Sequence, residues 1–245
     1  MAFNLFRKSN EPRPIYSVLG TDMHCHLIPQ VDDGSKCTEE SLECLRTLKA
    51  VGYSKVIVTP HFCSRFPNQE DDIVARYHQL CQAAAEAGID IELAGIGGEY
   101  RLDKELHSRL DTPRFLKVAD KYMLVELSLH QNAPGCDEMM FDLQVKGYDL
   151  ILAHPERYPY LNIDGSRMEQ LLNQGIYLQV NILSLGGFYG EESRRRAFTL
   201  IERGWVSFLG SDTHNALYCT ALRETSRDRK IEKLLEKHQF LNNTL

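Results

Sequence analysis

Histidine and carboxylate residues recur along the chain at spacings that suit metal binding. His24 and His26 are separated by one residue, and Asp212 and His214 repeat this spacing nearer the C-terminus. In an extended segment, side chains two positions apart project to the same side, so each pair could bind one cation. Because one such pair is also common at structural or solvated positions, the prediction of a metal site depends on further ligands elsewhere in the chain.

Further candidate ligands follow short apolar segments. Glu126 is enclosed by Leu124, Val125 and Leu127, and a buried carboxylate requires a compensating cation or an arginine partner. Asp33 lies in a turn-like stretch, where an aspartate often binds its own backbone. The full set contains five histidines and four carboxylates, namely His24, His26, His61, His154, His214, Asp33, Glu99, Glu126 and Asp212. Since one divalent ion takes about four to six donors, the set suits two or three ions, and ligands without thiolates favour Mn, Fe or Zn.

Alternating apolar and amphipathic segments predict the elements that position these residues. Strands are expected at residues 17–23, 55–59, 89–96, 122–127, 149–153, 176–180 and 205–209, and helices at 38–50, 70–87, 104–110, 136–146, 166–173, 191–203 and 223–238. Five glycines end predicted helices as left-handed caps would: Gly52, Gly88, Gly147, Gly175 and Gly204. The alternation predicts an α/β fold in which polar groups at the carboxyl ends of parallel strands meet at one rim.

Composition limits the class of protein. The 245 residues include 28 Lys and Arg and 34 Asp and Glu, for a net charge of −6, and 43% are hydrophobic. A packed core is therefore feasible, and a nucleic-acid-binding protein is disfavoured. The chain shows neither an apolar run of about 18 residues nor a secretory signal, and its seven cysteines form no CxxC pair. We expect a cytoplasmic location, a flexible N-terminal extension at residues 1–14 and a single domain at residues 15–245.

The order of short motifs in the chain resembles the PHP (polymerase and histidinol phosphatase) superfamily. Between about residues 20 and 215 the motifs are DMHCHL, VDDGSK, EESLECL, VTPHF, GGEYRL, VELS, LAHPERY, NILSL and GSDTHN. Within the superfamily, the chain is most similar to the bacterial capsule and exopolysaccharide tyrosine-protein phosphatases (CpsB/YwqE-like). The resemblance implies a distorted seven-stranded (β/α)7 TIM-like barrel with two or three divalent ions, Mn being favoured and Fe or Zn the alternatives. It also implies hydrolysis of phosphotyrosine on the tail of a bacterial tyrosine kinase of polysaccharide export.

The resemblance also assigns roles to residues. The same nine residues become metal ligands, and Arg157 of the HPERY motif contacts the phosphate. Relatives often carry a further arginine soon after the SDxHN motif, where this chain has none; Arg65 and Arg101 could substitute, or could be surface charges. The expected mechanism is attack of metal-bound hydroxide on phosphorus, with His61 or Asp212 assisting proton transfer.

Two other functions fit the same residues. One is a phosphatase for a small phosphomonoester similar to histidinol phosphate, and the other is a non-catalytic module that binds metal and a kinase tail. The cysteine-based phosphatase mechanism does not fit, because Cys25, Cys63 and Cys136 lack an arginine six positions later. A run of three arginines at residues 194–196 is interpreted as a solvated helix face, with a docking patch for an acidic tail as the alternative. The oligomeric state is left open.

Overall fold

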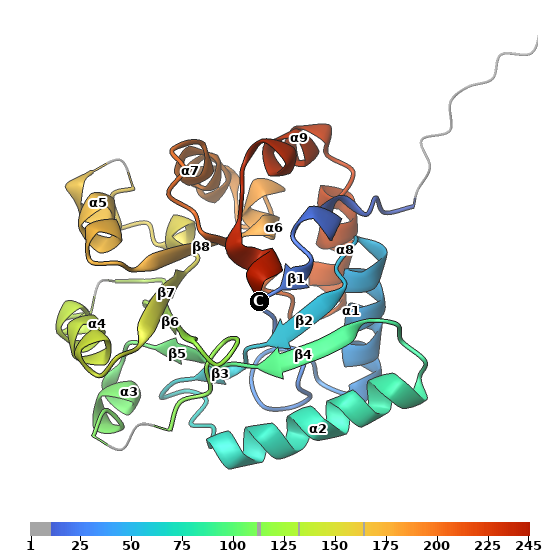
Figure 1. Cartoon of the computed structure of the whole chain (residues 1–245), viewed down its shortest axis with the longest axis horizontal. Coiled ribbons are helices and arrows are strands. Elements are labelled where there is room, and N and C mark those ends of the chain that lie inside the picture. The colour runs from blue at the N-terminus through green and yellow to red at the C-terminus, as the bar shows by residue number, and fades with distance from the viewer. Residues whose placement is uncertain (1–10, 112–113, 132, 164) are drawn as a thin grey trace, which may run out of the picture.

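The computed structural model describes residues 11–111, 114–131, 133–163 and 165–245, in which helices surround parallel strands (Figure 1). The strands are β1 (Thr21–Asp22), β2 (Lys55–Val58), β3 (His61–Phe62), β4 (Glu92–Ile96), β5 (Glu99–Arg101), β6 (Tyr122–Glu126), β7 (Asp149–Ala153), β8 (Tyr177–Asn181) and β9 (Phe208–Gly210). The α-helices are α1 (Thr38–Ala50), α2 (Glu70–Glu86), α3 (Lys104–Ser108), α4 (Cys136–Val145), α5 (Ser166–Asn173), α6 (Ile182–Leu185), α7 (Glu191–Glu202), α8 (Ala216–Thr225) and α9 (Arg229–Lys237). Three 3-10 helices are η1 (Ile15–Val18), η2 (Pro155–Arg157) and η3 (Leu241–Thr244).

The strands form two parallel sheets. One sheet has the order β1-β2-β4 and the other the order β3-β5-β6-β7-β8-β9. The chain passes from the first sheet to the second after β2 and again after β4. The predicted α/β fold with parallel strands is confirmed, whereas one closed sheet of seven strands is not confirmed and stays a prediction.

Local sequence explains why the strands divide. Pro60 separates β2 from β3, because proline has no N–H to donate to a sheet, and Gly97 and Gly98 separate β4 from β5. The two sheets approach each other where Cys25 pairs in parallel with Thr213. Near this bridge the main-chain N–H of Thr59 donates to the Cys25 oxygen at 2.8 Å, so hydrogen bonding continues at the rim beyond the strands themselves.

Several predicted boundaries need correction. The expected strand at 17–23 is reduced to β1 because the 3-10 helix η1 precedes it, and the strand expected at 205–209 begins only at Phe208. The helix expected at 223–238 is two helices, α8 and α9. Helix α8 starts earlier than predicted, because the Asn215 side chain caps it by accepting from Leu217 N, and Asp228 caps α9 by accepting from Lys230 N. The five predicted glycine caps are confirmed, since all five have positive φ angles.

An apolar cluster inside the sheets supports the rim. It includes Met23, Leu124, Ile151 and Phe208, all completely or almost completely buried. Glu126 lies two positions after Leu124 in β6, so its side chain projects to the same side, one step nearer the carboxyl end. Each buried side chain of this size contributes about 1.5–3 kcal/mol to stability. The apolar cluster thus packs inside the sheets directly below the polar residues of the rim.

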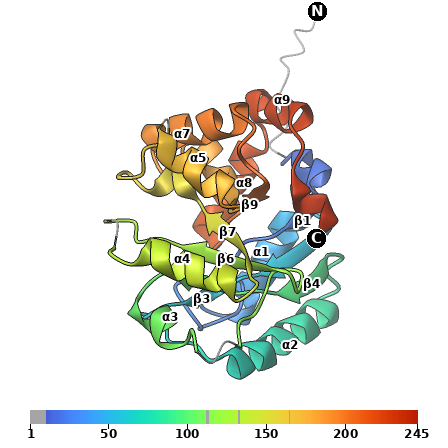
Figure 2. The ribbon, with the colours of Figure 1, turned by 60° about the vertical axis from the view of Figure 1, so that its left-hand side comes forward.

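The last turn of the chain is packed rather than loose. Figures 1 and 2 show the C-terminus close to β1. Asn242 is completely buried, and its side chain accepts from Leu209 N at 2.9 Å and donates to Thr21 O at 2.9 Å and Leu209 O at 2.6 Å. The Asn242 side chain therefore joins β1 and β9 at the end of the sheets remote from the rim.

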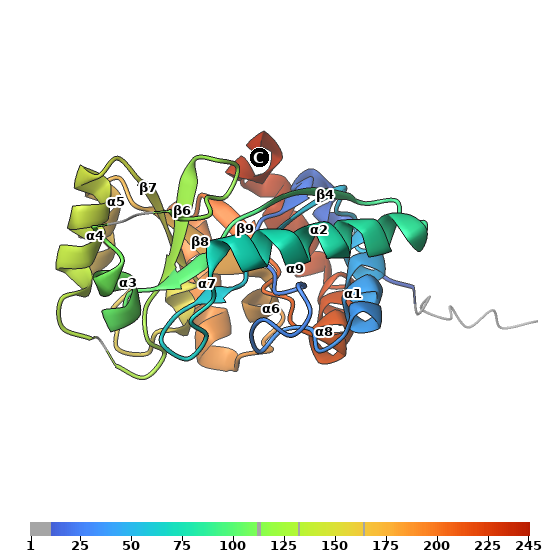
Figure 3. The same cartoon turned by 90° about the horizontal axis from the view of Figure 1, so that it is seen from below.

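Two helices that follow the rim loops lie against each other. Helices α1 and α8 run side by side, and α2 runs alongside β4, below it in the view of Figure 1 and in front of it in Figure 3. Of the predicted N-terminal extension, residues 1–10 lie outside the described residues, while Arg13 forms an ion pair with Glu232 in α9. In the part of the chain that the structure describes, the helices are too short or too polar to cross a membrane.

Candidate metal centre

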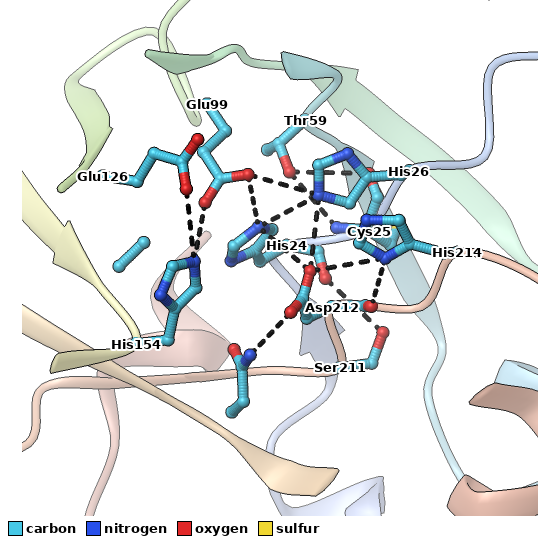
Figure 4. A network of polar contacts seen from close by, with 12 residues as sticks. His24, Cys25, His26, Thr59, Glu99, Glu126, His154, Ser211, Asp212 and His214 are labelled. Carbon is cyan, nitrogen blue, oxygen red and sulfur yellow. Dashed lines mark hydrogen bonds and ion pairs between the residues drawn. The ribbon is translucent and has the colours of Figure 1, made fainter. Parts of the chain in front are cut away.

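The carboxyl ends of the strands bring the predicted ligands together (Figure 4). Eight of the nine predicted ligands are buried at this rim: His24 and His26 after β1, His61 in β3, Glu99 in β5, Glu126 in β6, His154 after β7, and Asp212 and His214 after β9. The ninth, Asp33, has a side chain that is 41% exposed, and its Oδ1 lies 3.4 Å from His61 Nε2 and 3.6 Å from His214 Nε2. All nine predicted ligands therefore face one region.

The ligand atoms form four overlapping groups, in each of which three atoms lie within 4.8 Å of one another. The groups are His26 with His61 and His214, His24 with Glu99 and His154, His24 with His26 and Asp212, and His61 with Glu99 and Glu126. His24, His26, His61 and Glu99 each belong to two groups. Of these four residues only Glu99 could bridge two neighbouring ions, because a carboxylate has two oxygens whereas a neutral imidazole has a single lone pair to donate.

Glu99 lies at the centre of the cluster. Its Oε2 is 3.0 Å from His61 Nδ1 and 3.3 Å from both His24 Nε2 and His26 Nε2, and its Oε1 is 2.9 Å from His154 Nε2. Burial alone would raise the pKa of Glu99, but the nearby His24 and His61 outweigh it and hold this pKa well below its ordinary value. Among the described residues, buried Oε2 has no hydrogen-bond partner. A cation would compensate this carboxylate, so the residues present fit a metal ion.

Three histidines are oriented by acceptors that leave their Nε2 atoms facing the cluster. Nδ1 lies 2.9 Å from Gln179 Oε1 in His24, 2.9 Å from Asp32 Oδ2 in His26 and 2.8 Å from the main-chain oxygen of Asp212 in His214. A proton on Nδ1 donates to these acceptors, so the lone pair of Nε2 points inward. The Nε2 atoms of His24 and His26 are 3.3 Å apart, where one cation could bind both.

Asp32 and Gln179, which orient these candidate ligands, were not predicted from the sequence. Asp32 also accepts from the main-chain N–H groups of His61 and Gly34, both at 2.9 Å. Burial would raise the pKa of Asp32, but the His26 ring outweighs it and lowers this pKa. In β8, Gln179 donates to Asn181 Oδ1 at 2.9 Å. Two signals in the sequence could have identified these residues. Asp32 stands directly beside Asp33, and Gln179 and Asn181 are polar residues two positions apart at the end of an apolar strand.

Asp212 connects the cluster to Arg157. Its Oδ2 accepts from Arg157 Nη1 at 2.9 Å, Asn181 Nδ2 at 2.7 Å and the Tyr189 hydroxyl at 2.9 Å. Its Oδ1 faces the cluster, 3.4 Å from His26 Nε2. Burial would raise the pKa of Asp212, but nearby charged and hydrogen-bonding groups outweigh it and hold this pKa well below its ordinary value. One carboxylate oxygen is thus used for positioning, and the other is directed to the place where a cation would bind.

The cluster opens into a pocket of about 290 Å³ that is lined by the three predicted arginines. Arg157 has a side chain that is 18% exposed and lies over the Tyr189 ring at 4.1 Å. Arg101 donates from Nε to Glu126 Oε1 at 3.0 Å, so Glu126 has the arginine partner considered above as well as His61 Nδ1 at 3.3 Å. Arg65 is 72% exposed, and of the three it is held least firmly.

Two candidate ligands occupy unusual backbone conformations. His154 has a φ angle of 37° and Asp212 a φ angle of 53°, both in the left-handed region that costs residues with a side chain about 1–3 kcal/mol. Close packing also restricts Gly210, where a Cβ atom would lie 2.6 Å from Cβ of His24. The surrounding contacts thus maintain a backbone that the isolated segments would not favour, as is common at functional sites.

Comparison with known proteins agrees with this geometry. Tyrosine-protein phosphatase YwqE of Bacillus subtilis is 29% identical over 196 residues, covering 79% of this chain and 77% of the relative. Tyrosine-protein phosphatase CpsB of Streptococcus pneumoniae is 29% identical over 201 residues, with 79% and 82% covered. One solved structure superposes on this chain with a TM-score of 0.78 at 27% identity, covering 92% of this chain and 90% of that one. It belongs to the work that describes YwqE of Bacillus subtilis and CpsB of Streptococcus pneumoniae as metal-dependent tyrosine phosphatases. The family model for capsular polysaccharide synthesis, CpsB/CapC, matches residues 20–239, and the chain therefore belongs to the CpsB/CapC family.

Proposed function

We propose that this protein is a metal-dependent protein-tyrosine phosphatase that acts on a bacterial tyrosine kinase of capsule or exopolysaccharide export. The observation that carries the proposal is one pocket in which a buried histidine and carboxylate cluster adjoins Arg157. Phosphate esters carry negative charge on their oxygens, so they require cations on one side and hydrogen-bond donors on the other. The names of the relatives and the family support the same activity.

The nine candidate ligands would hold two or three divalent ions. Their nitrogen and oxygen donors suit Mn, with Fe or Zn as alternatives. When bound, such ions neutralise phosphate oxygens and lower the pKa of a coordinated water towards 7. Glu99 and Asp212 supply the negative charge that the ions need, and Gln179 and Asp32 fix the imidazoles that bind them.

The arginines of the pocket would bind the phosphate. We expect Arg157, which the Asp212 carboxylate and the Tyr189 ring hold in place, to donate hydrogen bonds to its oxygens. Arg101 is the next candidate, and Arg65, at the exposed edge, would contact the polypeptide or the phosphate. Arginine suits this role because its planar guanidinium can donate two parallel hydrogen bonds to one phosphate.

Departure of the tyrosine requires little acid assistance, since a phenol has a pKa of about 10. Of the two residues considered for proton transfer, His61 is better placed. Both residues line the pocket, but Asp212 already accepts three hydrogen bonds on Oδ2. We therefore assign His61 to proton transfer at the leaving oxygen and Asp212 to positioning and metal binding.

The remaining parts of the proposal concern setting and architecture. We expect the partner to be the phosphotyrosine tail of the kinase, because an extended segment can present a tyrosine to a pocket that lies at the rim. A cytoplasmic location would place the enzyme beside such a tail. We also expect residues 15–245 to act as one domain, with the rim hydrogen bonds completing a ring of seven strands.

Metal removal and substrate comparison test this function. Protein treated with a chelator and then supplied with Mn, Fe or Zn would be assayed for phosphate release from a phosphotyrosine peptide and from histidinol phosphate. The proposal predicts metal-dependent release from the peptide at a higher kcat/KM. Faster release from histidinol phosphate would favour the small-substrate function. Binding of the peptide without release from either compound would favour the non-catalytic module.

A further inference from the structure

A buried arginine of α7 contacts the loop that follows β7. Arg196 is only 6% exposed, and its guanidinium reaches the segment 155–161, which includes Arg157 and directly follows His154. The interpretation of residues 194–196 as a solvated helix face is therefore wrong for Arg196. Its neighbour Arg195 does pair at the surface, where it donates to Glu192 Oε1 at 2.7 Å.

Arg196 donates to main-chain oxygens along the whole loop. Its Nε donates to Glu156 O at 2.9 Å, and its Nη2 donates to Pro155 O at 3.2 Å, Tyr158 O at 2.8 Å and Leu161 O at 2.7 Å. Carbonyl oxygens that point towards one spot repel one another unless donors lie between them. A guanidinium suits this position because its donors spread in a plane, whereas the ammonium of lysine is a compact point charge.

Contacts on the other side hold the same loop. The Glu156 carboxylate accepts from Asn181 N at 3.0 Å and from the Ser184 hydroxyl at 2.6 Å, and the Tyr158 hydroxyl donates to Ala153 O at 2.9 Å. Between these anchors the Arg157 side chain extends to Asp212 and into the pocket. The direction of Arg157 thus depends on a loop whose carbonyls are held by Arg196.

We propose that Arg196 is a positioning residue for phosphate binding, which acts by fixing the loop that directs Arg157 into the pocket. The proposal rests on the proposed function, since that function assigns Arg157 to the phosphate. Displacing a positioned group by about 1 Å can cost about 100-fold in rate. An Arg196→Lys variant keeps the charge and loses the planar donors, so we expect kcat/KM for a phosphotyrosine peptide to fall by about 10- to 100-fold.

The test combines kinetics with binding of inorganic phosphate to the metal-loaded protein. Arg196→Lys and Arg196→Gln would be compared with Arg195→Met, which removes an arginine one position earlier in the same helix. Calorimetry would give phosphate affinity, and metal content and melting temperature would be measured for each protein. We expect weaker phosphate binding and a raised KM in the Arg196 variants, with metal content close to the wild-type value.

A double-mutant cycle separates positioning from general stabilisation. In an Arg157→Ala background, Arg196→Lys should change phosphate affinity and kcat/KM by less than about threefold, because the group that it positions is absent. Glu156→Ala, which removes the acceptor on the opposite side of the loop, should show the same coupling to Arg157 even if the Arg196 variants do not fold. Additive effects, or variants that only lower the melting temperature, would overturn the inference. Wild-type protein that binds phosphate without hydrolysing esters would contradict the proposed function instead, and the phosphate affinities would still test Arg196.

Discussion

Replacing Glu99 by glutamine is predicted to abolish most metal binding without changing the shape of the side chain. Glu99 belongs to two of the four ligand groups, and histidine nitrogens approach both of its oxygens. A glutamine amide must place its NH2 group at one of these positions, where no cation can bind. Removing a residue that only orients a ligand costs at least about tenfold in metal affinity. If each of the two groups loses that much, the product of their binding constants falls at least about 100-fold, which is about 2.7 kcal/mol summed over both groups.

The assay is the metal content of the purified protein, measured by elemental analysis together with kcat/KM at increasing Mn concentration. Glu92→Gln is the matched control, because it makes the same chemical change at an exposed position of β4. We expect Glu92→Gln to match the wild type, and Glu99→Gln to need far more Mn for any activity. Full metal content and normal kinetics in Glu99→Gln would refute the assignment of Glu99 as the shared ligand.

Three further substitutions test other parts of the site and the fold. Arg157→Lys should raise KM for aryl phosphates at least tenfold while metal content stays constant, because lysine cannot make two parallel hydrogen bonds to phosphate; a loss of metal instead would contradict the role of Arg157. The Tyr218 ring lines the pocket and stacks on His214 at 4.8 Å. Tyr218→Ala should therefore raise KM for a phosphotyrosine peptide several-fold more than KM for an alkyl phosphate, and equal effects on both substrates would argue against ring recognition. Asn242→Ala should lower the free energy of unfolding in urea by about 2–4 kcal/mol, since it leaves buried main-chain groups of β1 and β9 without partners, and an unchanged midpoint would show that this contact contributes little.

The candidate metal ligands could be chosen from the sequence because chemistry restricts such ligands to a few residue types at short spacing. His24 and His26 identify each other by their separation, and Glu126 is conspicuous as a carboxylate in an apolar strand. Their common location follows from the rule that the carboxyl ends of parallel strands share one rim. The positions of these residues in the structure agree with that reasoning.

The residues that hold the ligands could not be predicted in the same way. Gln179 contacts His24 from 155 positions away along the chain, and Asp32 contacts both the nearby His26 and the main-chain N–H of His61. The polar residues themselves are visible in the sequence, but the partners that they contact are not. Arg196 was assigned to the surface because it follows two other arginines, although Leu200, four positions later, is buried on the same face of α7. Similarly, the predicted strand at 55–59 ends before Pro60, but the two-residue strand β3 beyond it is too short to show a periodic pattern.

The contact of Asn242 with β1 and β9 has a consequence for biosynthesis. Thr21 leaves the ribosome long before Asn242, since the two residues lie 221 positions apart in the chain. Contacts over such separations form late, because a long loop must close before they contribute. The nascent chain therefore exposes the open end of its sheets until residue 242 has emerged. During this interval, chaperones that bind unpaired strands should engage the nascent chain, and their release should coincide with the emergence of residue 242.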